Sequence, residues 1–273
     1  MRLTGNVHTH TTFCDGKNTA REMAEAALAK GFDTLGYSGH MDPSIHMDLP
    51  AYQREIARLR EEYAGRLDIL CGVELDQYWE TAEIPGAEYV IGSTHFLRLP
   101  DGHLGCVDWK AEILEDLCRE HFGGDWYRLT AAYYAAEAEV WERTHCDIIG
   151  HFDLVARFNH EVPAFDEEDP RYWKPALEAM ERLTGTGALF ELNCGAYNRG
   201  RRRDFYPAER LLRQLRLWGG ELVITSDAHQ AELLDGGFAD AVEKARACGF
   251  QSVWMPGHRA DGTVDMRQRR IAL

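Results

Sequence analysis

Short apolar runs alternate with amphipathic segments along most of this 273-residue chain. Apolar runs of strand length occupy residues 34–38, 69–74, 89–95, 148–151, 188–193, 222–227 and 252–255, and another short run ends before Val7. Apolar residues recur at helical spacing in residues 19–30, 51–65, 170–184, 207–218 and 231–247. This alternation of strand and helix predicts an α/β protein with a parallel sheet and, at this length, a closed β/α barrel.

Several local signals refine these segments. Gly31 can end the helix that begins at Thr19, and Pro207 suits the first turn of a helix. Residues 106–144 depart from the alternation and predict one or two helices with a break near Gly123 and Gly124. The final apolar run precedes a polar, arginine-rich tail. Because no repeat or linker divides the chain, we expect one domain over residues 1–273.

Composition excludes several classes of function. A formal net charge of −15 disfavours binding to nucleic acid, because phosphate contacts need clustered Lys and Arg. The start of the chain lacks the apolar core of a signal peptide, and no segment has the apolar length of a membrane span. The seven cysteines show no C-x-x-C spacing, so we expect reduced thiols and a cytoplasmic location.

Histidine and acidic residues gather where the predicted strands end. His8 and His10 point to the same side of an extended segment, because side chains alternate there. Taken alone, such a pair is compatible with a solvated strand face. Nine candidates share this position, however: His8, His10, Asp15, His40, Glu74, His95, His151, Asp227 and His229. Because barrel strands converge at their carboxyl ends, the set predicts a site for two or three divalent ions (Zn, Fe or Mn).

A second group of residues indicates an anion site. Arginines follow the strand at 188–193, and guanidinium groups donate to phosphate in a fork-shaped geometry. We expect Arg157, Arg199 and Arg201 to bind substrate, and His46 to help position it. Arg202 and Arg203 are expected to be solvated. Clustered metal ions next to such arginines suit hydrolysis of a phosphoester. The remaining histidines are expected to be structural or solvated: His103, His121, His145, His160 and His258.

The ordered motifs H-T-H-T with a following Asp, G-Y-S-G-H, G-V-E-L, S-T-H-F, G-H-F-D and T-S-D-A-H span nearly the whole chain. In this order the chain resembles the PHP (polymerase and histidinol phosphatase) family, and within it the histidinol-phosphate phosphatases. The resemblance implies a distorted (β/α)7 TIM-like barrel with a trinuclear metal site at the carboxyl ends of the strands. All nine candidates match ligand positions of the family, with Glu74 as a bridging carboxylate and Asp227 and His229 as the closing pair.

The resemblance further implies hydrolysis of L-histidinol phosphate through a metal-bridging hydroxide. Glu74, Asp227 and His229 are the expected catalytic residues, the last two as possible proton relays to the leaving oxygen. The segment Glu191 to Tyr197 departs from the family pattern, and Asn198 stands where an Arg is often found. Hydrolysis of another small phosphomonoester or a nucleotide, and a metal-binding module without catalysis, therefore stay as alternatives. The expected partner is a small phosphorylated substrate, with no nucleic acid or membrane; the oligomeric state is open.

Overall fold

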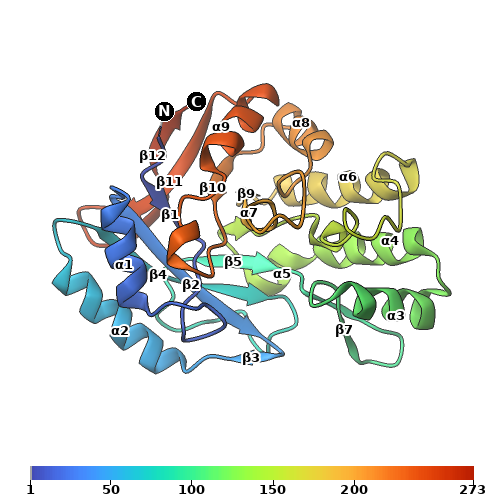
Figure 1. Ribbon diagram of the computed structural model, residues 1–273, viewed down its shortest axis with the longest axis horizontal. Coiled ribbons are helices and arrows are strands. Elements are labelled where there is room, and N and C mark those ends of the chain that lie inside the picture. Colours follow the sequence, from blue (N-terminus) through green and yellow to red (C-terminus); the bar gives the residue numbers. More distant parts are fainter. Residues whose placement is uncertain (1) are drawn as a thin grey trace.

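A parallel sheet forms the centre of the molecule (Figure 1). The computed structural model describes residues 2–273, apart from the side chain of His46. Within these residues, seven strands pair in parallel in the order β1 (Gly5–Asn6), β2 (Thr34–Asp42), β4 (Asp68–Asp76), β5 (Val90–Ser93), β8 (Ile148–Ile149), β9 (Leu189–Asn193) and β10 (Leu222–Thr225). Strand β3 (Ile45–His46) pairs antiparallel with the end of β2. Neighbours in the sheet follow the order of the chain, as in a β/α barrel.

The first and last parallel strands meet just beyond their carboxyl ends. Thr9 and Ala228 form an isolated parallel bridge. The amide of His10 donates to the carbonyl of Ala228 at 2.9 Å, and the amide of Ala228 donates to the carbonyl of His8 at 3.2 Å. The sheet is therefore a nearly closed, distorted barrel, and the predicted fold class is confirmed.

The helices lie around this barrel, most of them on its outside (Figure 1). They are α1 (Ala20–Ala29), α2 (Leu49–Glu62), α3 (Ala111–Phe122), α4 (Trp126–Glu137), α5 (Val140–Thr144), α6 (Pro170–Thr184), α7 (Gly195–Asn198), α8 (Glu209–Leu217) and α9 (Phe238–Ala247). The predicted helix at 170–184 has the bounds of α6. The predicted break in the middle region is confirmed, because Gly123 ends α3 with a φ of 67°. In the part of the chain that the structure describes, no helix combines the length and apolarity needed to cross a membrane.

Several predicted segments are wrong. Residues 106–144, predicted to form one or two helices, hold three, α3, α4 and α5. The helix predicted to begin at Pro207 begins at Glu209, so Pro207 lies before its first turn. The single helix expected at 231–247 is divided into a short 3₁₀-helix, η2 (Ala231–Leu233), and α9, because Gly237 adopts a φ of 72° before the first turn of α9. The arginine-rich end of the chain is not a tail but strand β12 (Val264–Ala272), which pairs antiparallel with β11 (Ser252–His258).

The β11–β12 hairpin lies against the amino ends of the barrel strands. His258 contacts Asp68 at the start of β4, and Trp254 donates to Glu221 just before β10. Met255 packs with Val7 and other apolar side chains inside the barrel. The hairpin therefore covers the end of the barrel opposite to the carboxyl ends of the strands. A further hairpin is formed by β6 (Phe96–Arg98) and β7 (Leu104–Cys106), and it follows the carboxyl end of β5.

Tyr89 fills the middle of the barrel, where glycines leave room for its ring. Its hydroxyl donates to the carbonyl of Val7 at 2.7 Å and lies 3.0 Å from the carbonyl of Tyr37. A Cβ placed on Gly72 would lie 2.3 Å from the Tyr89 ring, closer than side chains approach one another. The core of the barrel therefore depends on a glycine at position 72.

We predict that Gly72→Ala will lower the free energy of unfolding by about 1–3 kcal/mol, because the added methyl group overpacks the barrel. Urea denaturation followed by circular dichroism measures this change. In a Tyr89→Leu background, the same substitution should cost less, because the ring that it meets is gone. Equal losses in the two backgrounds would contradict this explanation.

Candidate metal centre

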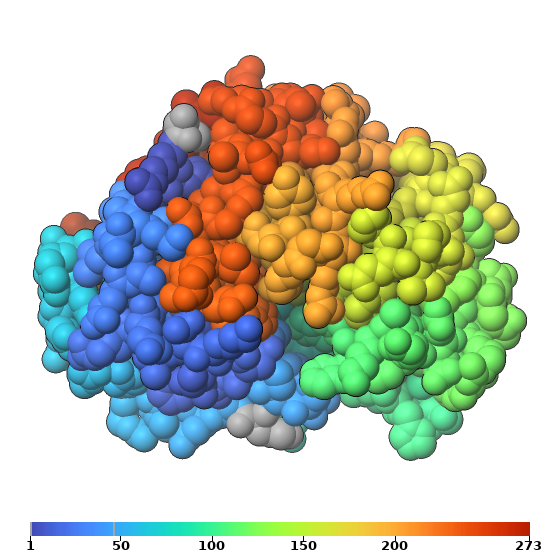
Figure 2. Space-filling view, viewed as in Figure 1, coloured from blue at the N-terminus to red at the C-terminus, as the bar shows by residue number. Residues whose placement is uncertain are grey.

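The carboxyl ends of the strands carry the predicted histidine and acidic residues to one face of the barrel. They come from six places: the segment after β1, strands β2 and β4, and the segments after β5, β8 and β10. A cavity of about 410 Å³ opens there, lined by Asp15, Lys17, His40, Glu74, His95, Asp108, Trp109, Lys110, His151, Leu154, Arg157, Arg199, Arg201, Tyr206, Asp227, His229 and Gln230. Figure 2 shows a hollow where the blue N-terminal segment faces orange and green segments from later in the chain.

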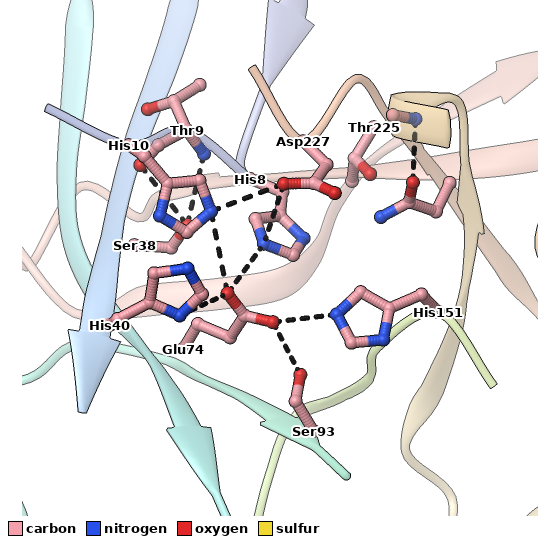
Figure 3. A network of polar contacts seen from close by, with 12 residues as sticks. His8, Thr9, His10, Ser38, His40, Glu74, Ser93, His151, Thr225 and Asp227 are labelled. Carbon is pink, nitrogen blue, oxygen red and sulfur yellow. Dashed lines mark hydrogen bonds and ion pairs between the residues drawn. The ribbon is translucent and has the colours of Figure 1, made fainter. Parts of the chain in front are cut away.

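Glu74 lies at the centre of this arrangement (Figure 3). Its Oε1 accepts a hydrogen bond from Ser93 at 2.7 Å and lies 2.8 Å from Nε2 of His151. Its Oε2 lies 3.0 Å from Nδ1 of His40 and 3.2 Å from Nε2 of His8. Burial alone raises the pKa of Glu74, but the surrounding imidazoles outweigh it and hold the pKa well below its usual value. A buried carboxylate therefore faces several imidazole nitrogens with both of its oxygens.

Three groups of side chains in residues 2–273 bring their ligand atoms within 4.8 Å of one another. They are His10, Asp15, His40 and His229; His8, His10 and Asp227; and His40, Glu74 and His95. His10 and His40 are shared between groups. His151 falls outside the three groups, although its Nε2 contacts Glu74. All nine predicted residues thus lie together, in an arrangement that offers separate but adjoining ion sites.

In the described part of the chain, several buried atoms at this centre face one another in ion-pair contacts but form no hydrogen bond. Nε2 of His8, Nε2 of His10 and Oε2 of Glu74 are buried there without a hydrogen-bond partner. Such atoms are costly unless something compensates them. Burial and the nearby His229 lower the pKa of His10 to about 3, so its ring is neutral, the form that binds metal. These donors fit divalent ions such as Zn, Fe or Mn.

The pKa of His8 also indicates that a cation is favoured at this centre. Burial lowers this pKa, but the charges of Glu191 and Glu74 outweigh burial and raise it well above its usual value. The carboxylates around the His8 ring therefore favour a positive charge next to it. A proton or a metal ion at Nε2 can supply that charge.

Glu191, on β9, orients two of these histidines and was not predicted as a site residue. Its Oε1 lies 2.5 Å from Nδ1 of His8, and its Oε2 accepts from the amide of His151 at 2.7 Å. Nδ1 of His8 is thereby occupied, which leaves Nε2 directed at Glu74. Carboxylates in this role fix the orientation of metal-binding imidazoles. A glutamate within the apolar run Leu189–Asn193 was the available sequence signal.

Two of the predicted arginines make defined contacts in the cavity. Nη1 of Arg157 donates to Oδ2 of Asp108 at 3.0 Å. Nη1 of Arg199 donates to the carbonyl of Asp227 at 3.0 Å, and its Nη2 donates to the carboxylate of Asp227 at 3.3 Å. Arg201 also lines the cavity. The side chain of His46 lies outside the described residues, so its predicted contribution is not tested.

The expectation that Arg202 is solvated is wrong. Its side chain is only 6% exposed and donates to the carbonyl of Ala156 at 2.9 Å. It also pairs with Glu167 at 3.2 Å and with Asp153 at 3.6 Å. Arg202 is therefore a buried structural cation, whereas Arg203 is exposed as predicted.

Other histidines have the structural or solvated environments that were predicted. His258 lies between Asp68 at 2.6 Å and Glu88 at 3.2 Å, outside the site. The ring of His103 is 83% exposed. These contacts separate both from the histidines that surround Glu74.

The chain is similar to known proteins over most of its length. Residues 6–195 match the sequence profile of the PHP domain family. The chain is 33% identical over 263 residues to a probable histidinol-phosphatase of Deinococcus radiodurans, covering 90% of this chain and 94% of that protein. A structure described as the putative histidinol phosphatase hisK of Listeria monocytogenes superimposes with a TM-score of 0.71 at 20% identity, covering 86% and 99% of the two chains. The histidinol phosphate phosphatase of Lactococcus lactis, complexed with zinc, L-histidinol and phosphate, gives 0.70 at 18% identity, covering 97% and 100%.

Proposed function

Since this chain belongs to the PHP domain family, we propose that it is a metal-dependent phosphomonoesterase that hydrolyses L-histidinol phosphate to L-histidinol and phosphate. The observation that carries the proposal is Glu74, a buried carboxylate within reach of imidazoles from four segments, in the wall of an open cavity. The name of the D. radiodurans relative supports the substrate, as do the L-histidinol and phosphate bound to the L. lactis protein.

We propose that two or three divalent ions are held by the nine side chains that the strands bring together. His10, Asp15, His40 and His229 would surround one position, and His8, His10 and Asp227 a second. Glu74, with His40, His95 and His151, would complete the third and bridge it to the others. When bound, divalent ions neutralise phosphate charge and activate water for attack on phosphorus.

The residues of the chain would then position the substrate and move a proton. Arg157, Arg199 and Arg201 line the cavity beside the histidine cluster and would bind the phosphate oxygens. As the oxygen of water forms a bond to phosphorus, the water gives up a proton and the bond from phosphorus to the leaving alkoxide breaks. The alkoxide takes up the proton that the water has lost. Asp227 and His229, whose Oδ1 and Nδ1 lie 3.5 Å apart, would relay the proton to it.

A metal-binding module without catalysis is the alternative from another class. It needs ligands but no room for a substrate, whereas this centre opens into a cavity of about 410 Å³ with three arginines in its wall. Turnover assays on a panel of small phosphoesters separate the two functions. Metal-dependent preference for L-histidinol phosphate supports the proposal, and binding of metal without turnover of any ester favours the module.

We further propose that the protein works in the cytoplasm as one domain over residues 1–273. The free state of all seven cysteines supports a reducing compartment. In the described residues, all strands apart from the two hairpins β6–β7 and β11–β12 belong to one sheet. This single sheet supports one domain.

We predict that Arg157→Ala will raise KM for L-histidinol phosphate by about 10- to 100-fold with a smaller change in kcat, because a charged hydrogen bond to phosphate is lost. Steady-state kinetics on metal-reconstituted protein measure both constants. Arg203→Ala is the matched control, because Arg203 is exposed, and its KM should equal that of the wild type. An unchanged KM in Arg157→Ala would remove Arg157 from the phosphate site.

A further inference from the structure

Tyr206 is held rigidly at the edge of the candidate metal centre. Its backbone pairs with Asn193 at the end of β9, through hydrogen bonds of 2.8 and 3.2 Å. The guanidinium carbon of Arg202 lies 4.9 Å from the centre of its ring. The ring also lies near the His151 ring, at a centroid distance of 6.3 Å and an angle of 71° between the ring planes. Backbone and ring are therefore both fixed, and the position of the hydroxyl is fixed with them.

The hydroxyl of Tyr206 is the part of this residue that has no role in the fold. Tyr206 is 2% exposed and lines the same cavity as the histidine cluster. In residues 2–273, the hydroxyl finds no hydrogen-bond partner. A buried hydroxyl without a hydrogen-bond partner is unfavourable. We therefore expect its acceptor to be a group of a molecule that enters the cavity.

The charges around the hydroxyl indicate the chemistry of that acceptor. The guanidinium of Arg202 lies over the ring of Tyr206, where it pairs with Asp153 and Glu167. Arg157 and Arg199 line the cavity together with Tyr206. Arg157 pairs with Asp108 and Arg199 with Asp227. An anionic oxygen that accepts from the hydroxyl can also accept from these two guanidinium groups, which favours an anion over a neutral group.

We infer that the hydroxyl of Tyr206 donates a hydrogen bond to a phosphate oxygen of the substrate, in a subsite shared with Arg157 and Arg199. This inference rests on the proposed function, because it takes the phosphomonoester as the ligand of the cavity. It assigns to Tyr206 a substrate-binding role that the sequence did not indicate. The rigid support from Asn193 and Arg202 holds the donor in place before substrate arrives, which lowers the entropic cost of binding.

Tyr206→Phe removes this donor and leaves the ring in place. We expect KM for L-histidinol phosphate and the inhibition constant of inorganic phosphate each to rise by about 10- to 100-fold, with a smaller effect on kcat. Tyr197→Phe is the control, because the hydroxyl of Tyr197 donates to Asp240 at 2.7 Å outside the cavity. Both variants are compared with the wild type as full-length protein reconstituted with metal, and their metal content is measured by elemental analysis.

Calorimetric titration with inorganic phosphate separates this inference from the proposed function, because it does not require turnover. Weaker phosphate binding by Tyr206→Phe at unchanged metal content supports the inference, even if the wild type fails to hydrolyse L-histidinol phosphate. Equal phosphate affinity in wild type and Tyr206→Phe overturns it, as does wild-type protein that binds no phosphate. A loss of bound metal in Tyr206→Phe also overturns it, since the residue then supports the metal centre and not the phosphate.

Discussion

Glu74→Gln will lower kcat for L-histidinol phosphate by about 10³-fold or more and reduce the metal content of the purified protein. Glutamine has the shape of glutamate but no charge, and one of its two terminal atoms is a donor. Oε1 and Oε2 of Glu74 both face imidazole nitrogens, among them Nε2 of His151 at 2.8 Å and Nδ1 of His40 at 3.0 Å. The amide therefore removes negative charge from the centre and presents an NH₂ group where an acceptor is needed.

Steady-state kinetics and elemental analysis measure both effects after reconstitution with metal. Glu83→Gln is the matched control, because Glu83 is an exposed glutamate on the loop after β4. It should keep wild-type kcat and metal content. Wild-type turnover in Glu74→Gln would remove Glu74 from the catalytic centre and with it the bridging role that we propose.

Asp227→Asn is expected to lower kcat by about 10²- to 10³-fold. Oδ1 of Asp227 lies 3.3 Å from Nε2 of His10, and its Oδ2 accepts from Arg199. Burial raises the pKa of Asp227, but Arg199 and His8 outweigh it and hold the pKa well below its usual value, so the carboxylate is ionised. The substitution removes this charge from the metal ligand set and from the proposed proton relay.

Asparagine is the informative replacement at this position for a conformational reason. Asp227 has a φ of 47°, in the left-handed region that asparagine tolerates better than most residues. Asp227→Asn should therefore keep the backbone and a thermal midpoint near that of the wild type, whereas Asp227→Ala would combine a chemical and a conformational change. If Asp227→Asn keeps wild-type kcat, the carboxylate has no part in the reaction.

The barrel and the histidine cluster could be predicted because they depend on local features. Strand and helix periodicity gives the order of the elements, and the alternation of side chains places His8 and His10 on one side of an extended segment. The strands converge at their carboxyl ends in any β/α barrel, so the residues there meet whatever the details of packing. No local feature marks β12, because exposed arginines separate the apolar residues that pack against the barrel, which are Val264, Met266 and Ile271.

Residues whose roles depend on tertiary contacts were missed or misjudged. Arg202 belongs to an arginine-rich loop, and its burial follows from Asp153 and Glu167, which come from other segments. Glu191 supports His8 only because closure of the barrel brings β9 close to the segment after β1, with β10 between them. The role of Glu191 therefore needs the fold before it can be recognised.

We propose that metal ions at the Glu74 cluster carry out phosphoester hydrolysis. The most direct measurement is phosphate release from L-histidinol phosphate by protein that has been stripped of metal with a chelator and then reloaded with Zn, Fe or Mn. We predict no phosphate release from the stripped protein and saturable release after at least one of these metals is restored. Stripped protein that hydrolyses the ester as fast as reloaded protein, or reloaded protein that binds metal but releases no phosphate, would contradict the claim.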